Sequence, residues 1–256
     1  MGKVNLVRES GVSIIQLNRP ETYNALDIEA LEQLEAIITE VKNNEDQIVI
    51  ITGEGKAFCA GGDVSMMATL KDVDLFDDLM NAITNIVTSL YFMPKVVISA
   101  VNGSAAGLGM SLALNADYVV ANKEAKFGML FGGIGLIPDG GAHFFLQQRV
   151  GTERAKQFIW SLEQINADEA KQAGYVDVLS DEDAFTAAKI LAFKLSQAPI
   201  QAFLQTKEIL HTQNKLQLEE ILQLEKAGQM KASQTKDHRE GVRAFLEKRK
   251  PQFQGK

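Results

Sequence analysis

Two short, continuous runs of β-branched and aliphatic residues give the clearest hydrophobic pattern in the chain. They cover residues 48–52 and 96–101, and neither alternates regularly with polar residues. Such runs are typical of strands that are covered on both faces of a sheet. Near the N-terminus, segments 4–9 and 13–18 flank Ser10 and Gly11, and apolar positions alternate in the second segment. This arrangement predicts a β-hairpin.

Apolar residues recur at intervals of three and four after Asp27, which is the spacing of one face of a helix. Asp27 is a suitable N-cap for this helix, and Asn43-Asn44 ends it. Another helix is expected over 72–92, before Pro94. Two short strands follow within 117–128. The remaining sequence favours helices, which we expect near 152–161, 167–173, 182–197, 200–212, 216–234 and 237–249.

Two of the predicted strands lead into turns of small residues, at 60–62 and at 107–109. Such turns allow the backbone to approach a ligand closely, and two converging backbone N–H groups would form an oxyanion hole. Gly-rich turns after strands are often only turns, so a structural role is the alternative. The order strand, strand, helix recurs along the first two thirds of the chain, and this favours a spiral of ββα units. A dinucleotide-binding loop is not favoured, because Leu112 occupies the third glycine position of its motif.

Composition and charge exclude several classes of function. The 256 residues carry a net charge of −7, so there is no basic footprint for nucleic acid. No apolar run is long enough for a membrane span, and the N-terminus lacks a signal core, so we expect a cytoplasmic protein. The single cysteine, Cys59, excludes an internal disulfide and is better explained as a small buried thiol than as a nucleophile. No cluster of residues has metal-ligand spacing, and no metal is expected.

Five motifs together resemble the crotonase family, also called the enoyl-CoA hydratase/isomerase superfamily. They are LNRPETYNAL at 17–26, GKAFCAGGD at 55–63, KVVISAVNGSAAGLGMSLAL at 95–114, AKFGMLFGGIGLIPDGG at 125–141 and DHREGVRAFLEKRKPQF at 237–253. The resemblance implies an α/β fold of the ClpP/crotonase type. It implies a ββα spiral core with an acyl-CoA site over residues 1–195. The helical region over 196–256 would then join subunits into a trimer or a dimer of trimers.

The same resemblance implies the site residues. The backbone N–H groups of Gly62 and Leu108 would hold the thioester oxygen of an acyl-CoA. Coenzyme A enters as part of the substrate, so no separate cofactor is expected. Phe245 and Lys248 would reach coenzyme A from the same or an adjacent subunit, although a solvated basic turn is an equal alternative. The remaining residues expected to contact substrate are Ala60, Gly61, Asp63, Val64, Ser111 and Phe131.

The position of the carboxylates separates the hydratases of the family from its isomerases. A hydratase of this type has two glutamates, and Ser111 and Phe131 occupy the matching positions here. Asp139 stands where isomerase-type members carry an aspartate. One carboxylate can move a double bond, whereas hydration requires groups that handle water and a carbon-bound proton. Apolar surroundings would raise the pKa of Asp139. If Asp139 were instead a helix N-cap, its pKa would be lowered.

The sequence therefore predicts an acyl-CoA isomerase that converts a 3-enoyl thioester to a 2-enoyl thioester, with Asp139 as acid and base. One alternative is an enoyl-CoA hydratase, and a second is an acyl-CoA binding protein without catalysis. Ser111 is explained equally well as a ligand of the substrate or as a small packing residue. For His143, a packing or surface role is favoured over one in the pocket. Apolar residues of the segment 64–92 suggest an apolar acyl group, and these are Met66, Met67, Leu75, Phe76 and Leu79.

Overall fold

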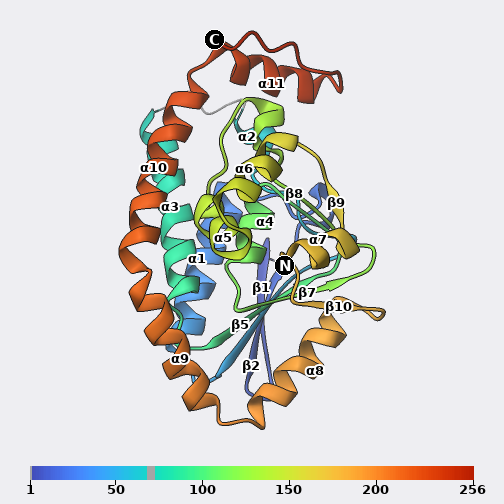
Figure 1. Ribbon diagram of the computed structural model, residues 1–256, viewed down its shortest axis with the longest axis vertical. Helices are drawn as coiled ribbons and strands as arrows, with labels where there is room; N and C mark the ends of the chain where they lie inside the picture. The colour runs from blue at the N-terminus through green and yellow to red at the C-terminus, as the bar shows by residue number, and fades with distance from the viewer. Residues whose placement is uncertain (1, 68–72) are drawn as a thin grey trace.

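A computed structural model of the protein describes residues 2–67 and 73–256 (Figure 1). Its larger sheet has six strands in the order β1-β2-β3-β5-β7-β10. β1 and β2 are antiparallel and form the predicted hairpin, with positive φ angles at Ser10 and Gly11. The other neighbours in this sheet are parallel. The strands are Val4–Glu9, Val12–Leu17, Ile48–Gly53, Val96–Val101, Tyr118–Asn122 and Val178–Ser180.

The larger sheet is covered on both faces, as the continuous apolar runs predict. In β3, Val49 and Ile51 belong to the main core, whereas Ile48 and Ile50 belong to a second apolar cluster on the opposite face. Helix α8 (Ala184–Ser196) supplies small residues to that second cluster, including Ala184, Ala188 and Ala192. Their spacing of four places them on one side of the helix, so α8 can lie close against the strands. The continuous burial of β3 follows from this double cover.

A smaller sheet of four strands, in the order β4-β6-β8-β9, carries the two small-residue turns. Its strands are Ala57–Cys59, Ser104–Ala106, Lys126–Gly128 and Ile165–Asn166. The strand β8 and the strand β7 of the larger sheet confirm the pair expected within 117–128. Strands β4 and β6 were not predicted from the sequence, because three residues are too few to establish a hydrophobic period. Helix α4 (Leu108–Leu114) begins directly after β6 and the turn at Gly107.

The predicted helices are confirmed, with ends that differ from the predictions by no more than three residues. Asp27 is the N-cap of α1, and its side chain accepts a hydrogen bond from the backbone N–H of Ala30. Position 72, where the second helix was expected to begin, lies outside the described residues. The helices not yet given are α1 Ile28–Asn43, α2 Val64–Met67, α3 Val73–Tyr91, α5 Ala142–Val150, α6 Thr152–Ser161, α7 Ala167–Ala173, α9 Ile200–Gln213, α10 Lys215–Ser233 and α11 Lys236–Leu246.

The last three helices return along the core rather than forming a separate body. In Figure 1, α10 runs along α3 on one side of the molecule, and α11 lies at the end of the molecule opposite α8. α10 contacts α3 and α5, while α11 contacts α2 and the 3-10 helix η2 (Leu130–Ile134). The boundary at residue 195 stays a prediction, but residues on both sides of it meet across these contacts.

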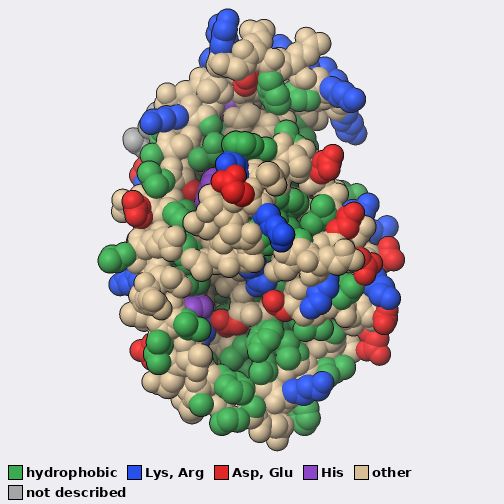
Figure 2. All heavy atoms as spheres, in the orientation of Figure 1, with side chains coloured by type: hydrophobic (Ala, Val, Ile, Leu, Met, Phe, Trp, Pro, Cys, Tyr) green, Lys and Arg blue, Asp and Glu red, His purple; other side chains and the backbone are tan. Residues whose placement is uncertain are grey.

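In the same orientation, two kinds of side chain are concentrated at opposite ends of the visible surface (Figure 2). Lys and Arg side chains border the end that carries α11, and hydrophobic side chains gather over the region of α8. Ile190 and Phe193 of α8 are among the exposed large hydrophobic residues. In the part of the chain that the structure describes, no helix combines the length and the apolar character needed to cross a membrane.

The contact between α4 and β4 leaves no room for a side chain at Gly109. A Cβ atom at this position would lie 2.2 Å from the carbonyl oxygen of Cys59. Because the obstacle is backbone, relief requires one of the two elements to move. We expect Gly109→Ala to lower the free energy of unfolding by about 1–3 kcal/mol, which chemical denaturation would measure. Gly133→Ala is the matched control, since a Cβ there meets nothing within 4 Å. Equal stability of the two variants would contradict the prediction.

Candidate active site

A cavity of about 700 Å³ opens between the core and the C-terminal helices. Side chains from α1, α2 and α3 supply an apolar lining, in which Met66, Met67, Phe76 and Leu79 appear as expected. Leu75, from the same set, is partly exposed and is not among the lining residues. Polar and charged side chains come from the end of α10 and from α11: Gln229, Ser233, Gln234, His238, Arg239, Arg243 and Glu247. The cavity can therefore hold an apolar group beside a polar one.

The two small-residue turns meet at the wall of this cavity. A Cβ atom on Gly61 would lie 2.8 Å from the carbonyl oxygen of Ala106 and 3.3 Å from the backbone nitrogen of Leu108. Gly61 and Gly107 both have positive φ angles, 98° and 53°, which side chains disfavour. Gly62 and Leu108 line the cavity. Neither of their N–H groups donates to a carbonyl of the described chain, so both are available to an oxygen in the cavity.

Cys59 contacts the first small-residue turn, at residues 60–62, through its thiol. It is buried, its thiol donates to the carbonyl oxygen of Asn24 at 3.2 Å, and its Sγ accepts the N–H of Gly61 at 3.4 Å. Burial raises the pKa of the Cys59 thiol to about 12. A thiol that stays protonated and is enclosed by backbone is a poor nucleophile, which supports the predicted role as a small buried residue.

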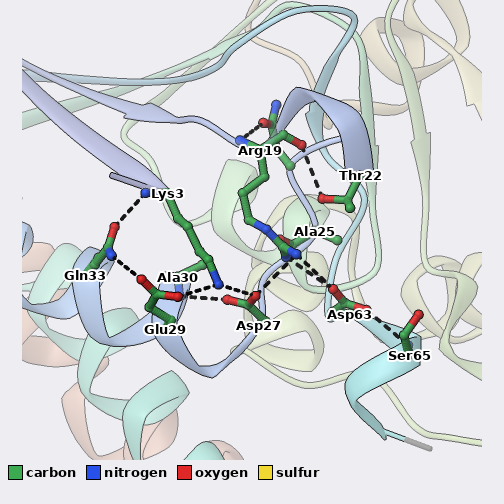
Figure 3. A network of polar contacts seen from close by, with 11 residues as sticks. Lys3, Arg19, Thr22, Ala25, Asp27, Glu29, Ala30, Gln33, Asp63 and Ser65 are labelled. Atoms are coloured by element: carbon green, nitrogen blue, oxygen red, sulfur yellow. Dashed lines mark hydrogen bonds and ion pairs between the residues drawn. The ribbon is translucent and has the colours of Figure 1, made fainter. Parts of the chain in front are cut away.

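A network of ion pairs holds the residue that follows Gly62 (Figure 3). The Arg19 guanidinium lies 3.2 Å from carboxylate oxygens of both Asp27 and Asp63, and it also donates to the carbonyl oxygen of Ala25. The other carboxylate oxygen of Asp63 accepts the N–H of Ser65, at the start of α2. Asp63 is therefore engaged with the protein, and it is not among the cavity-lining residues. Its contact with Arg19 ties the Gly61-Gly62 turn to the start of α1.

Asp139 is the buried carboxyl group of the cavity wall. Asp139 is 5% exposed, and its Oδ2 accepts a hydrogen bond from Nε2 of Gln229 at 2.8 Å. The other oxygen, Oδ1, has no hydrogen-bond partner among the described residues. Burial, with a further contribution from the charge of Glu225, raises the pKa of Asp139 to about 7. A carboxyl group with this pKa can both accept and return a proton near neutral pH.

The alternative role of Asp139 as a helix cap is wrong. The N-cap of helix α5 is Gly141, with φ of 78°, and no side chain at this position accepts a capping hydrogen bond. Glu225 of α10 supplies the missing acceptor: its carboxylate accepts the N–H groups of Gly141 and His143 at 2.8 and 3.1 Å. The same carboxylate lies 2.8 Å from Nδ1 of His143. The packing role favoured for His143 agrees with this contact.

Glu225 and Gln229 are two site residues that were not predicted from the sequence. The buried positions of this helix are Leu218, Leu222, Glu225 and Gln229, at spacings of four, three and four. Their spacing matches one buried helix face, and a charged residue on such a face normally has a specific partner. The signal was therefore present in the sequence, as two polar residues in the apolar register.

The remaining predicted site residues occupy different surroundings. Ser111 is fully buried, and its hydroxyl donates to the carbonyl oxygen of Asp139 at 2.7 Å. Phe131 lines the cavity. Ala60 is exposed, Val64 is half-buried, and neither these two nor Gly61 is among the lining residues. Phe245 and Lys248 are exposed and lie outside the cavity lining of this single chain.

Within residues 2–67 and 73–256, no group of three or more His, Cys, Asp or Glu side chains is arranged to hold a metal ion.

Comparison with known proteins places the chain in a family. A family model described as enoyl-CoA hydratase/isomerase matches residues 7–256. YhaR of Bacillus subtilis (strain 168), named provisionally as an enoyl-CoA hydratase/isomerase, is 43% identical over 243 residues, covering 95% of each chain. The 1,2-epoxyphenylacetyl-CoA isomerase of Escherichia coli (strain K12) is 37% identical and covers 97% of each chain.

The fold agrees with solved structures of the same group. An enoyl-CoA hydratase from Mycobacterium avium subsp. paratuberculosis K-10 matches with a TM-score of 0.89 at 30% identity, covering 99% of each chain. The fold is that of the crotonase superfamily. Within this superfamily, the chain belongs to the enoyl-CoA hydratase/isomerase family of enzymes.

The burial of Asp139 predicts a pH-dependent cost in stability. In the unfolded chain an aspartate ionises near pH 3.8, whereas in the fold the pKa of Asp139 is about 7. As the pH rises between these values, the unfolded state loses this proton first, so the group increasingly favours unfolding. Above pH 7 the cost is constant and amounts to a few kcal/mol, on the order of 1.4 kcal/mol for each pKa unit.

We expect Asp139→Asn to remove this cost, because an amide does not ionise. The variant should be more stable than the wild type at pH 8, and the advantage should shrink towards pH 4. Denaturation by urea across this pH range would measure both effects. A variant that is equally stable or less stable at pH 8 would contradict the raised pKa.

Proposed function

We propose that the chain is an enoyl-CoA isomerase that moves a double bond from the 3-position to the 2-position of an acyl-CoA thioester. The supporting observation is the free, buried Oδ1 of Asp139 in the wall of the cavity that Gly62 and Leu108 also line. A single carboxylate beside two backbone donors meets the needs of this reaction. The reaction consumes no partner besides the acyl-CoA substrate, so the proposal includes no further cofactor.

The proposed reaction has two proton transfers. The Asp139 carboxylate removes a proton from C2, next to the thioester carbonyl, and the electron pair moves onto the carbonyl oxygen to form a dienolate. The N–H groups of Gly62 and Leu108 donate to that oxygen, and each such donor typically lowers a barrier by about 2.7–4 kcal/mol. Asp139, now protonated, returns the proton at C4, and the double bond forms between C2 and C3. Atoms and charge balance without water.

Other carboxylates near the cavity are less suited to serve as a second acid or base. Glu225 accepts hydrogen bonds from two backbone N–H groups and lies against His143, which occupies its oxygens. Glu247 is exposed and pairs with Arg249. Ser111 donates to the backbone of Asp139, and Phe131 is apolar. This distribution favours isomerisation over hydration, which needs a group to activate water as well as one to protonate carbon.

The substrate class follows from the cavity lining. Its leucine, methionine and phenylalanine side chains favour an apolar acyl chain or ring beside the thioester. The Escherichia coli relative, at 37% identity, is named for an epoxide of phenylacetyl-CoA. We therefore include ring-opened and epoxide thioesters of aromatic acids, besides 3-enoyl-CoA esters, in the substrate panel.

The exposure of Phe245 and Lys248 bears on the assembly. Since both lie outside the cavity of their own chain, we propose that they contact coenzyme A bound to an adjacent subunit of a trimer. The exposed hydrophobic residues of the C-terminal helices, among them Phe203, Leu216 and Leu224, would supply apolar contact area between subunits.

The first test is the product formed from 3-hexenoyl-CoA and from crotonyl-CoA, followed by mass spectrometry in deuterated water. We expect conversion of 3-hexenoyl-CoA to its 2-enoyl isomer and little addition of water to crotonyl-CoA. Asp139→Asn should lower the isomerisation rate at least 100-fold, since general acid–base groups typically contribute ~10²–10⁴-fold. Water addition that survives this substitution would instead support a hydratase. Binding of acyl-CoA without turnover over the whole panel would support a binding protein.

The pH dependence of the rate offers a second test. Asp139 must be ionised to remove the first proton, and its pKa is about 7. The value of kcat/KM for 3-hexenoyl-CoA should therefore fall about tenfold for each pH unit below 7, and level off above it. An acidic limb with a midpoint near pH 4 would indicate an ordinary, solvated carboxylate and would contradict the assignment.

A further inference from the structure

Helix α10 presents two buried polar side chains to the catalytic carboxyl group. Glu225 and Gln229 are each 2% exposed, and they lie one helical turn apart. They reach residues of the loop and helix around Asp139 from 82 to 90 positions further along the chain. Such burial is costly for both side chains unless their polar atoms are paired.

Gln229 holds one half of the Asp139 carboxylate. Its amide nitrogen donates to Oδ2 at 2.8 Å, which leaves Oδ1 as the oxygen without a described partner. The amide oxygen of Gln229 is itself buried and has no hydrogen-bond partner among the described residues. The side-chain amide therefore bonds Asp139 through its nitrogen while its oxygen stays unpaired there. Gln229 also lines the cavity. The contact both orients the carboxylate and favours its ionised form.

Glu225 places a second negative charge near Asp139. Its carboxylate accepts the N–H groups of Gly141 and His143, at the N-terminal end of α5, where the helix dipole favours a negative charge. Nδ1 of the His143 side chain lies 2.8 Å from this carboxylate, and the effect of His143 on the pKa of Asp139 is opposite to that of Glu225 and smaller. The other ionisable groups that line the cavity are His238, Arg239, Arg243 and Glu247, all from α11 or its C-cap.

We propose that Glu225 and Gln229 are a pair of positioning residues for Asp139, in which Gln229 orients the carboxylate towards the substrate and Glu225 places a buried carboxylate against the start of α5 beside it. This inference rests on the proposed acid–base role of Asp139. The two residues act in opposite directions: Glu225 favours the protonated form of Asp139, and Gln229 favours the ionised form. A carboxyl group held between these influences can exchange its proton with carbon in both directions near neutral pH.

Two substitutions separate these influences. Glu225→Gln removes the charge but keeps an oxygen that can accept one of the two N–H groups at the start of α5. Gln229→Met removes the donor while nearly keeping the volume. We expect Glu225→Gln to move the acidic limb of kcat/KM to lower pH by about one unit, and Gln229→Met to move it to higher pH by a similar amount. Gln229→Met should also lower kcat about tenfold, with a smaller change in KM, because the carboxylate loses its orientation.

The matched controls lie on the exposed face of the same helix. Glu220→Gln removes a charge and Gln223→Met removes an amide, and both residues are exposed. Neither control should move the limb by more than about 0.2 pH units, because exposed charges are screened by solvent. A loss of helix stability alone would change the amount of folded enzyme without shifting the limb, and it would not produce shifts of opposite sign.

A stability measurement, which does not depend on catalysis, tests the inference separately from the proposed function. The stabilisation by Asp139→Asn at pH 8 reports the pKa of Asp139 through linkage, and it can be measured again in the Glu225→Gln and Gln229→Met backgrounds. We expect a smaller stabilisation in the first background and a larger one in the second.

The outcomes distinguish the two claims. If Asp139→Asn leaves isomerisation intact, the proposed function fails, whatever the stability measurements give. If Asp139→Asn abolishes isomerisation but neither α10 variant changes the limb or the linked stabilisation, the inference fails and the proposed function stands. Shifts of the same sign in both variants would also overturn it. Should one α10 variant fail to fold, the sign of the shift in the other still tests the inference.

Discussion

The structure depends on the close approach of two backbone turns, one after β4 and one after β6. The carbonyl oxygen of Cys59 lies 2.2 Å from where a Cβ of Gly109 would be, and the carbonyl oxygen of Ala106 lies 2.8 Å from where a Cβ of Gly61 would be. This contact brings the first N–H of α4 beside the turn that carries the Gly62 N–H. Two donors built from backbone cannot rotate away, so in the proposed reaction the fold itself would preorganise the donors that stabilise the oxyanion. A side chain in either contact would separate the donors.

Asp139 shows the opposite strategy, in which a functional group is kept in unfavourable surroundings. Gln229 donates to only one of its oxygens, and the nearby Glu225 carboxylate, which accepts hydrogen bonds at the start of α5, adds a negative charge. Leaving Oδ1 unpaired costs stability, and the remainder of a well-packed core must offset this cost. In the proposed reaction, this oxygen would take the proton from the substrate. Stability and reactivity are therefore opposed at a single atom.

Much of the fold could be predicted because its signals are local. The continuous apolar runs, the hairpin at Ser10-Gly11 and the cap at Asp27 each depend on a few adjacent residues, and all are confirmed. The convergence of Gly62 and Leu108 needed the family resemblance, since spacing alone does not place two turns together. The cap of α5 could not be found locally, because its acceptor, Glu225, is supplied from another helix. Polar residues in an apolar helix register were the available clue.

The dependence of Asp139 on α10 makes the site a product of the whole chain. Residues that line the cavity range from Leu26 to Glu247, so the pocket is complete only when the last helices have returned along the core. Contacts between segments so distant in sequence require the closure of long loops, and they are lost when either partner opens. Local detachment of α10 would expose the Asp139 carboxyl group to water and remove Gln229 and Glu225 together. The pKa of Asp139 would then return towards its ordinary value, so the C-terminal helices determine the chemistry of the core as well as covering it.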